Sequence, residues 1–314
     1  LAAAWGLQNP RLAFGTLPGR APALVSVRDV RARVERLAPL LVTGRVVTPV
    51  VALESLWWVA ELYATSDRYP LAERRLFDGR EVTAAQHAAV ALVNAHTGRV
   101  TIVADAAPSP LARAWLRPTL RHAIGVAALP EALRAALPPR WDALELEGGT
   151  AVRHGSRRLD ITGHDVQLPE SGDSALSPVA PPVWLAGRAT WAATAAVLDS
   201  TRAVRGLLVA PGGRDRTVRY VAMGEGVRFP ALLDGTRQVV DSLRRTRPEV
   251  RRGWTRIVPT AGLARFVTPL YAPRGDGAPG LDGVVVADAR GVAIGSSVLA
   301  AAGPTLRPVT AGPV

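Results

Sequence analysis

The histidines come first, because His is the side chain whose ordinary pKa best suits acid–base chemistry near neutral pH. The chain contains five of them: His87, His96, His122, His154 and His164. No two are spaced i, i+4 like the paired ligands of helical zinc sites. The closest grouping of metal-binding side chains is His154, Asp160, His164 and Asp165, which could form a metal or hydrolytic site. A solvated loop is the favoured interpretation, since loops are rich in such residues, and we predict no catalytic residue and no metal site.

Two glycine-rich segments have the composition of phosphate-binding loops. Residues 210–215 read Ala-Pro-Gly-Gly-Arg-Asp after a predicted strand, and residues 275–280 match Gly-x-Gly-x-x-Gly. A phosphate loop needs a helix directly after it, whose N-terminus faces the anion, and no predicted helix follows either segment. Both are predicted to be turns or loops, and no cofactor is expected. Glu145 and Glu147 could do acid–base work only beside a partner from elsewhere in the fold, so surface charge is favoured for them.

The composition excludes several classes of protein. All 38 basic residues are Arg, and the net charge of the 314-residue chain is +12. Without Lys there is no Schiff-base lysine and no phosphate-loop lysine, which disfavours pyridoxal enzymes, kinases and the usual nucleotide hydrolases. Without Cys there is no disulfide and no thiolate metal site. Aromatic residues make up only 5% of the chain, which argues against stacking on single-stranded nucleic acid. We expect the chain to bind a protein or membrane surface, which includes anionic lipid headgroups. We expect no binding to nucleic acid.

Two groups of residues are candidates for an interaction surface. The densest basic cluster consists of Arg244, Arg245, Arg247, Arg251 and Arg252, which suits lipid headgroups or an acidic protein surface. Adjacent tryptophans of a strand point to opposite faces of the sheet. One of Trp57 and Trp58 is therefore expected in the core, and the other either packs or anchors a partner.

The hydrophobic patterns predict an α+β fold of mixed or antiparallel hairpins with a few packed helices. Helices are predicted over residues 26–41, 110–115, 130–137 and 230–245. Strands are predicted over residues 46–53, 56–65, 183–198, 203–211, 218–224, 255–259, 264–272, 283–288 and 291–296. Residues 83–104 have two interpretations, a hairpin over 90–103 or a helix over 84–93.

A long irregular segment is predicted between two lobes. Residues 145–182 lack periodicity and are rich in Gly, Ser, Pro and Asp, a composition typical of loops. The predicted division is an N-terminal α+β lobe at 1–145, an irregular connecting segment at 146–182 and a C-terminal α+β lobe at 183–314. A weak internal echo relates Trp58–Ala64 to Phe266–Ala272, each followed by a Val-rich hairpin. It predicts two related lobes, with coincidence as the alternative.

The most specific stretch of the chain is Leu56–Pro70, which ends in Thr-Ser-Asp-Arg-Tyr-Pro. From the residues alone, Asp67–Pro70 is predicted to form a structural corner. The whole stretch resembles the L-x-W-I-x-D-A-Y-T-T-S-D-R-Y-P segment of a family of large, uncharacterised bacterial membrane proteins. Val30–Leu41 and Asn94–Asp105 are similar to a helix and a hairpin of that family, and Phe266–Tyr271 is similar to its Y-V-E-P-L-Y segment. The matching pieces run nearly end to end and resemble the C-terminal extracytoplasmic part of these proteins.

The resemblance implies an extracytoplasmic α+β domain in a membrane setting, because family members carry several spanning helices upstream. No stretch here reaches the ~18 apolar residues of a spanning helix, so we expect a truncated relative or a piece separated from those helices. The family has no assigned catalytic residues.

The leading hypothesis is a non-catalytic accessory subunit, peripheral to the membrane and periplasmic, that docks on a membrane protein complex of a photosynthetic or respiratory assembly. The alternative is a binding module for an anionic ligand or cell-envelope polymer, using the Arg244–Arg252 cluster and the Gly212–Arg214 loop. The third hypothesis is a hydrolase using His154, Asp160 or His164.

Overall fold

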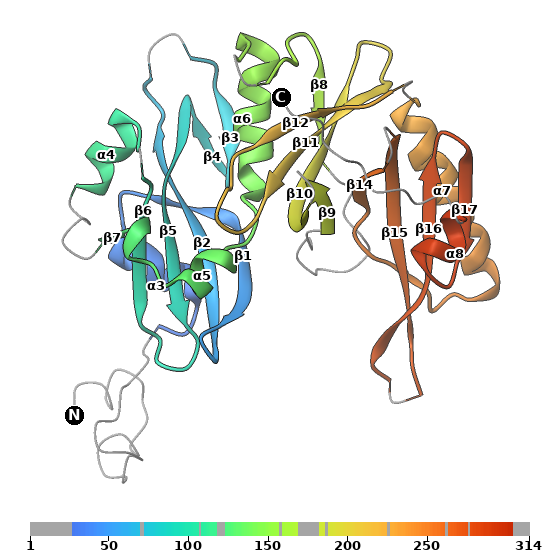
Figure 1. Ribbon diagram of the computed structural model, residues 1–314, viewed down its shortest axis with the longest axis horizontal. Helices are drawn as coiled ribbons and strands as arrows, with labels where there is room; N and C mark the ends of the chain where they lie inside the picture. The colour runs from blue at the N-terminus through green and yellow to red at the C-terminus, as the bar shows by residue number, and fades with distance from the viewer. Residues whose placement is uncertain are drawn as a thin grey trace.

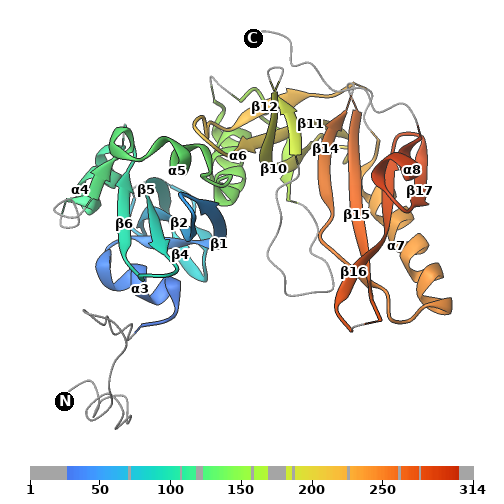
Figure 2. The ribbon, with the colours of Figure 1, turned by 60° about the horizontal axis from the view of Figure 1, so that its bottom comes forward.

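The computed structural model describes residues 27–69, 72–106, 108–117, 123–156, 159–168, 182–185, 188–224, 227–260, 263–275 and 277–303. Within these ranges the predicted α+β class is confirmed, since helices pack on mainly antiparallel sheets. Three main sheets lie in a row across the molecule (Figures 1 and 2). No helix in these ranges is long and apolar enough to cross a membrane.

The first sheet has the strand order β1-β2-β5-β6-β7. Its strands are β1 (Val42–Ala52), β2 (Ser55–Ser66), β5 (Ala84–Asn94), β6 (Val100–Ala104) and β7 (Ala123–Gly125). All neighbouring strands are antiparallel except β6 and β7. The predicted hairpins are confirmed, and a helix over 84–93 is wrong, because this segment is the strand β5 at the centre of the sheet.

Helices cover both faces of the first sheet. On one face lie α3 (Val30–Leu37) and α4 (Pro110–Leu116), and α5 (Glu131–Ala135) packs on the other. The helix predicted over 26–41 is shorter, because Asp29 caps it by accepting a hydrogen bond from the Ala32 amide. Ser26, where the helix was predicted to begin, lies outside the described residues. A small hairpin, β3 (Arg75–Phe77) and β4 (Arg80–Val82), was not predicted.

The prediction of irregular structure over residues 145–182 is wrong where a helix and a strand occupy parts of this segment. Residues Trp141–His154 form the helix α6, and Asp165–Gln167 form the strand β8. Gly148 and Gly149 weaken the helical pattern in the sequence, but a Cβ at Gly148 would overlap Leu208 of β11. The glycine therefore allows α6 to lie close against the second sheet. Residues 169–181, in the rest of the predicted irregular segment, lie outside the described residues.

The second sheet has the order β12-β11-β10-β8, with β9 paired to β10. These strands are β9 (Pro182–Leu185), β10 (Arg188–Leu198), β11 (Val204–Pro211) and β12 (Arg219–Ala222). One face packs on α6 through Leu144 and Leu208, and the other packs toward the third sheet through Leu207 and Phe266.

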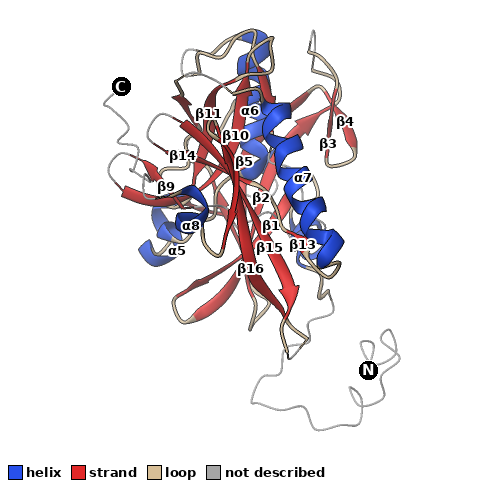
Figure 3. Ribbon diagram, turned by 90° about the vertical axis from the view of Figure 1, so that its right-hand side faces the viewer, coloured by secondary structure: helices blue, strands red, loops and turns tan. Residues whose placement is uncertain are grey.

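The third sheet contains β13 (Arg251–Arg252), β14 (Arg256–Thr260), β15 (Leu263–Pro273), β16 (Pro279–Asp288) and β17 (Gly291–Gly295). The helix α7 (Phe229–Thr246) packs along it, as Figure 3 shows, and buries Val240 against Leu270 and Val285. The short helix α8 (Val298–Ala302) follows β17.

One order of elements recurs three times within the described residues: a helix followed by a four-stranded antiparallel meander. The first unit joins α3 to β1-β2-β5-β6, the second joins α6 to β8-β10-β11-β12, and the third joins α7 to β14-β15-β16-β17. The echoing segments Trp58–Ala64 and Phe266–Ala272 lie in β2 and β15, the second strands of their meanders. The echo thus falls on corresponding strands, and the middle unit was not predicted from it.

Candidate functional site: a buried charge network beside a cleft

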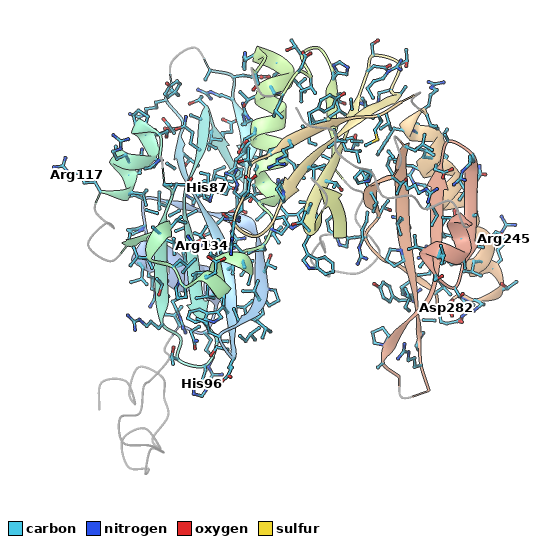
Figure 4. The ribbon with its side chains drawn as sticks, in the orientation of Figure 1. His87, His96, Arg117, Arg134, Arg245 and Asp282 are labelled. Carbon is cyan, nitrogen blue, oxygen red and sulfur yellow. The ribbon has the colours of Figure 1, made fainter. Side chains whose placement is uncertain are left out.

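A β-bulge in β5 brings His87 to the same face of the first sheet as Glu61. Leu62 of β2 pairs with Ala89, but Tyr63 pairs with His87, so Ala88 is the extra residue. A bulge shifts the alternation of side chains by one position. His87 therefore lies away from the α3 face, to which Ala89 and Ala91 contribute, and faces the second unit (Figure 4).

His87 is held between two carboxylates. Its Nε2 lies 2.6 Å from Oε2 of Glu61, and its Nδ1 lies 2.6 Å from Oδ2 of Asp105. The side chains of His87 and Glu61 are 7% and 6% exposed, and that of Asp105 is 38% exposed. Both ring nitrogens donate when the ring is protonated, so the arrangement suits an imidazolium.

Arg216, from the loop between β11 and β12, completes the network from the second unit. Its Nη2 contacts Oε1 of Glu61, and the same nitrogen donates to the Pro138 carbonyl at 2.8 Å. Arg140 in turn donates from Nη2 to the backbone carbonyl of Arg216 at 2.9 Å and lies 3.1 Å from Oε1 of Glu147. The network therefore joins the first sheet, the segment before α6 and the second sheet.

The charges fix one another's protonation. Burial alone would raise the pKa of Glu61, but the charge of Arg216 and the hydrogen bond from His87 outweigh it and lower this pKa to about 2. Burial disfavours the charged ring of His87, but the hydrogen bonds to Asp105 and Glu61 prevail and raise its pKa. The pKa of Asp105 is lowered by His87 against the opposing effect of burial. Glu61 and Asp105 are thus held as carboxylates beside the cations His87 and Arg216.

A second ion pair lies beside the network. Asp142, 2% exposed at the start of α6, accepts from Arg45 Nε at 2.7 Å and from the Arg45 amide at 3.1 Å. A Cβ at Gly44 would lie 2.5 Å from Oδ2 of Asp142, so only glycine lets β1 approach this carboxylate. Burial raises the pKa of Asp142, and the contacts with Arg45 offset part of this effect.

A cleft of about 580 Å³ opens between the first sheet and α6. Charged and polar groups line it, namely Tyr63, Gln86, His87, Asp105, Ser109, Arg140, Glu147, Thr150 and Ser156. Its apolar wall comes mainly from α6 and includes Leu146. The Tyr63 hydroxyl, on a residue that is 1% exposed, has no hydrogen-bond partner within the described part of the chain.

The charged side chains that line the cleft already bind one another. Both ring nitrogens of His87 are bound to carboxylates, so neither is free to take a proton from a substrate. Among the described residues, no group of three His, Asp or Glu side chains is placed to hold a metal ion. The geometry is suited to binding and to joining the units.

The predicted tryptophans lie at the two faces of β2. Trp57 packs partly buried against the cluster of Val59 and Leu92, and Trp58 packs partly buried against the α3 face. Trp57 Nε1 donates to the Ala52 carbonyl at 3.1 Å. Both therefore contribute to the core and retain partial exposure.

The predicted basic cluster lies at the end of α7 and in β13, far from the cleft (Figure 4). Arg247 is held by Asp282 at 2.6 Å and Glu249 at 3.5 Å. Arg244 donates to the Val250 carbonyl and Arg251 to the Pro248 carbonyl. Arg245 is exposed, and Arg252 is partly buried in β13.

The predicted glycine loop at residues 210–215 runs from the end of β11 into the loop before β12 and packs against the segment around Leu137. The Gly213 amide donates to the Leu137 carbonyl at 2.7 Å, and Arg214 pairs with Glu131. Gly275, Gly277 and Ala278 lie in the loop of the β15–β16 hairpin as predicted, whereas Pro279 and Gly280 already belong to β16.

The structure spreads the polar grouping of residues 154–165. His154 ends α6, His164 Nδ1 lies 3.2 Å from the Thr162 carbonyl, and Asp165 pairs with Arg202 at 2.5 Å. Asp160 is exposed. Glu147 lies in the cleft, whereas its predicted companion Glu145 pairs with Arg45 at 2.6 Å. Pro70 and His122 lie outside the described residues.

Sequence reasoning missed Glu61, His87, Asp105 and Arg216 as a group. Glu61 and His87 lie 26 residues apart, and Arg216 lies 155 residues from Glu61. The one available signal was Glu61 itself, a charged residue within an otherwise apolar strand pattern.

These features define an α+β protein in which a buried ionic network joins the first and second units. Known proteins are similar to the first of these units. The sequence model of an uncharacterised protein family (UPF0182) matches residues 1–137. UPF0182 proteins of Mycobacterium tuberculosis and Mycobacterium bovis are 29% identical over 139 residues, covering 40% of this chain and 14% of each relative. A UPF0182 protein of Mycolicibacterium vanbaalenii is 28% identical over 120 residues, covering 33% of this chain and 12% of the relative. No solved structure matches.

The matched region has a clear relation to the site. It contains Glu61, His87 and Asp105, whereas Arg140 and Arg216 lie beyond residue 137. The predicted resemblance ran nearly end to end, but the family model covers the first unit. The aligned segment spans 14% of the length of the mycobacterial relatives.

Proposed function

We propose that this protein is a non-catalytic, extracytoplasmic accessory subunit that docks peripherally on a membrane protein complex of the photosynthetic or respiratory kind. The observation that carries the proposal is a group of exposed apolar side chains at the β1–β2 turn. Val51 is 77% exposed, Leu53 is 51% exposed and Leu56 is 41% exposed. We call the segment 51–56, which carries these three side chains, the apolar turn.

The backbone of the apolar turn is strained. Leu53 has φ 52° and Glu54 has φ 55°, values that cost a residue with a side chain about 1–2 kcal/mol. A Gly or Asn would fit such a two-residue turn at lower cost. A leucine that is both strained and exposed adds little to folding, which supports a role in contacting a partner.

The surroundings of the apolar turn suit an interface. The Ala95 amide donates to the Leu56 carbonyl at 2.9 Å, so the β5–β6 turn with exposed His96 and Arg99 lies beside it. Trp57, paired with Val50, forms the base of the turn. An apolar tip with an aromatic base is the arrangement found at interface centres, and Glu54 is the acidic residue within it.

Charge supports a membrane setting for the partner. The net charge of +12 favours approach to a surface of anionic lipid headgroups or acidic protein. The Arg244–Arg252 cluster supplies further cations at the opposite end of the molecule (Figure 4). His87, with both nitrogens bound to carboxylates, supports a binding role over a catalytic one.

The test is recovery of partners from gently solubilised membranes of the source organism, with the tagged chain as bait and mass spectrometry of the bound chains. The wild type should recover a stoichiometric set of membrane subunits. A triple variant, Val51→Ser with Leu53→Ser and Leu56→Ser, should lose that set, because it removes the apolar contact area.

The matched control replaces two exposed apolar residues elsewhere. Leu281 is 52% exposed and Leu299 is 59% exposed in the third unit, and Leu281→Ser with Leu299→Ser should keep the full set. The proposal is wrong if the wild-type bait returns alone, or if the triple variant recovers the same subunits as the wild type.

A further inference from the structure

We propose that the cleft between the first sheet and α6 binds a small organic amine. In this arrangement Asp105 and Glu147 hold the ammonium group, Tyr63 accepts one of its hydrogen bonds, and α6 contacts the aliphatic skeleton. The site lies apart from the apolar turn and is independent of the docking function.

The sign of the accessible charge selects a cation. Among the described residues that line the cleft, the carboxylates are the more exposed charged groups, with side chains 38% exposed for Asp105 and 29% exposed for Glu147. The cations beside them are covered, at 7% for His87 and 15% for Arg140. Of these described charged groups, the acceptors are therefore the more accessible to a ligand, although the chain as a whole carries a net charge of +12.

The two cations are already occupied by groups of the protein. His87 donates to Glu61 and Asp105, and Arg140 donates to the backbone carbonyl of Arg216 and lies against Glu147. An anionic ligand would have to displace these partners. An ammonium group adds donors to carboxylate oxygens without breaking the network.

The Tyr63 hydroxyl gives the site an unfilled position. Its ring is fixed by edge contacts with Phe77 at 5.1 Å and His87 at 5.5 Å between ring centres. Tyr63 is one of the residues that line the cleft, and its buried hydroxyl lacks a hydrogen-bond partner among the residues described. A buried hydroxyl without a partner is costly, so a ligand donor that reaches this oxygen gains an interaction that water-exposed sites do not provide.

The size and the apolar wall of the cleft fit a carbon chain beside the ammonium. Leu146, Ala143 and Ala151 face the cleft from α6, and Leu159 adds to the same wall. The volume of about 580 Å³ lies within the range of small-molecule sites. An aliphatic mono- or diamine matches this combination of apolar wall and carboxylate acceptors.

The test is calorimetric titration with three probes of equal chain length: putrescine (1,4-diaminobutane), neutral 1,4-butanediol and anionic succinate. Saturable binding of putrescine alone is the expected result. Asp105→Asn and Glu147→Gln should each weaken it at least tenfold, and Tyr63→Phe, which keeps both carboxylates, should weaken it severalfold. The control Asp234→Asn, on α7 and 61% exposed, should bind putrescine like the wild type.

Circular dichroism of each variant separates loss of binding from loss of folding, and any one folded cleft variant suffices for the comparison. The proposal is overturned if the wild type does not bind putrescine, or if succinate or butanediol binds equally well. It is also overturned if the folded cleft variants keep wild-type affinity. The apolar-turn variant should retain putrescine binding, so failure of this site and failure of the docking function are distinguishable.

Discussion

Arg216 on the β11–β12 loop forms an ion pair with Glu61 on β2, across 155 residues of sequence, and both side chains are nearly buried, at 11% and 6% exposed. Glu61 also binds His87, so one carboxylate joins the second unit to the bulged strand of the first. Buried pairs of this kind add little net stability over an apolar pair, but removal of one partner leaves an uncompensated charge.

Arg216→Ala is therefore expected to lower the free energy of unfolding by about 3–5 kcal/mol, as measured by urea denaturation. The control is Arg214→Ala, two residues earlier in the same loop. Arg214 is 69% exposed and pairs with the half-exposed Glu131, so its loss should cost about 0–1 kcal/mol. Equal effects of the two substitutions would contradict the assignment of the buried pair.

The network also predicts a pH profile of stability. The pKa of His87 is raised above its ordinary 6.5, so its contribution is fully present below pH 6.5 and is lost as pH rises through the raised value. The pKa of Glu61 is lowered from 4.5 to about 2, so its contribution is present above pH 4.5 and is lost as pH falls toward 2. The contribution of the network to the free energy of unfolding should be greatest between pH 4.5 and pH 6.5.

His87→Gln should flatten the alkaline side of this profile, measured as urea midpoint against pH. His96→Gln is the matched control, because His96 is exposed on the β5–β6 turn and its ring has no described ionic partner (Figure 4). An unchanged alkaline slope in the His87 variant would show that the imidazolium does not stabilise the fold.

The adjacent glycines of α6 should respond to alanine with opposite signs. A Cβ at Gly148 would overlap Leu208, whereas a Cβ at Gly149 meets only the flexible end of Arg153 at 3.4 Å. Gly148→Ala should destabilise the protein by about 1–3 kcal/mol through overpacking, less the gain in helix propensity. Gly149→Ala should stabilise it by up to about 1 kcal/mol. Thermal denaturation of the two variants checks this, and a shared sign would refute the close packing of α6 on β11.

The apolar turn predicts opposite effects on stability and docking. Leu53→Gly relieves the positive φ of 52° and should stabilise the fold by up to about 1 kcal/mol, while recovery of membrane subunits weakens. Leu56→Gly, within β2, should instead destabilise the fold by roughly 0.5–1 kcal/mol. Urea denaturation beside the membrane pull-down measures both quantities. A Leu53 variant with stronger docking would contradict the role of this side chain.

Local patterns predicted the elements whose residues agree with their surroundings. The Val- and Trp-rich segments predicted the β1–β2 hairpin, and Pro110 marked the start of α4. The structure adds the cap, because Ser109 accepts a hydrogen bond from the Ala112 amide. The helix α6 was missed because glycine lowers the local helix propensity, whereas Gly148 is present to allow close packing against Leu208. Tertiary contact overrides propensity at such positions.

The candidate site could not be predicted from local sequence patterns, for a different reason. Alternation along β5 places His87 with Ala89 and Ala91, and only the bulge at Ala88 turns it toward Glu61. The bulge leaves no mark in the residue types of this Ala-rich strand. Arg216 is one of many arginines, and its role depends on how the second unit docks.

The segment that the UPF0182 family model matches contains only part of the buried ionic network. Residues 1–137 contain Glu61 but neither Arg216 nor the helix α6 that closes the cleft. Without the second unit, the first unit would expose the Glu61 carboxylate, which is buried in the whole chain, together with the part of the cleft that the first sheet lines. The second unit thus covers the buried carboxylate and the cleft of the first unit. A fragment that contains the first unit alone is expected to need another surface to cover them.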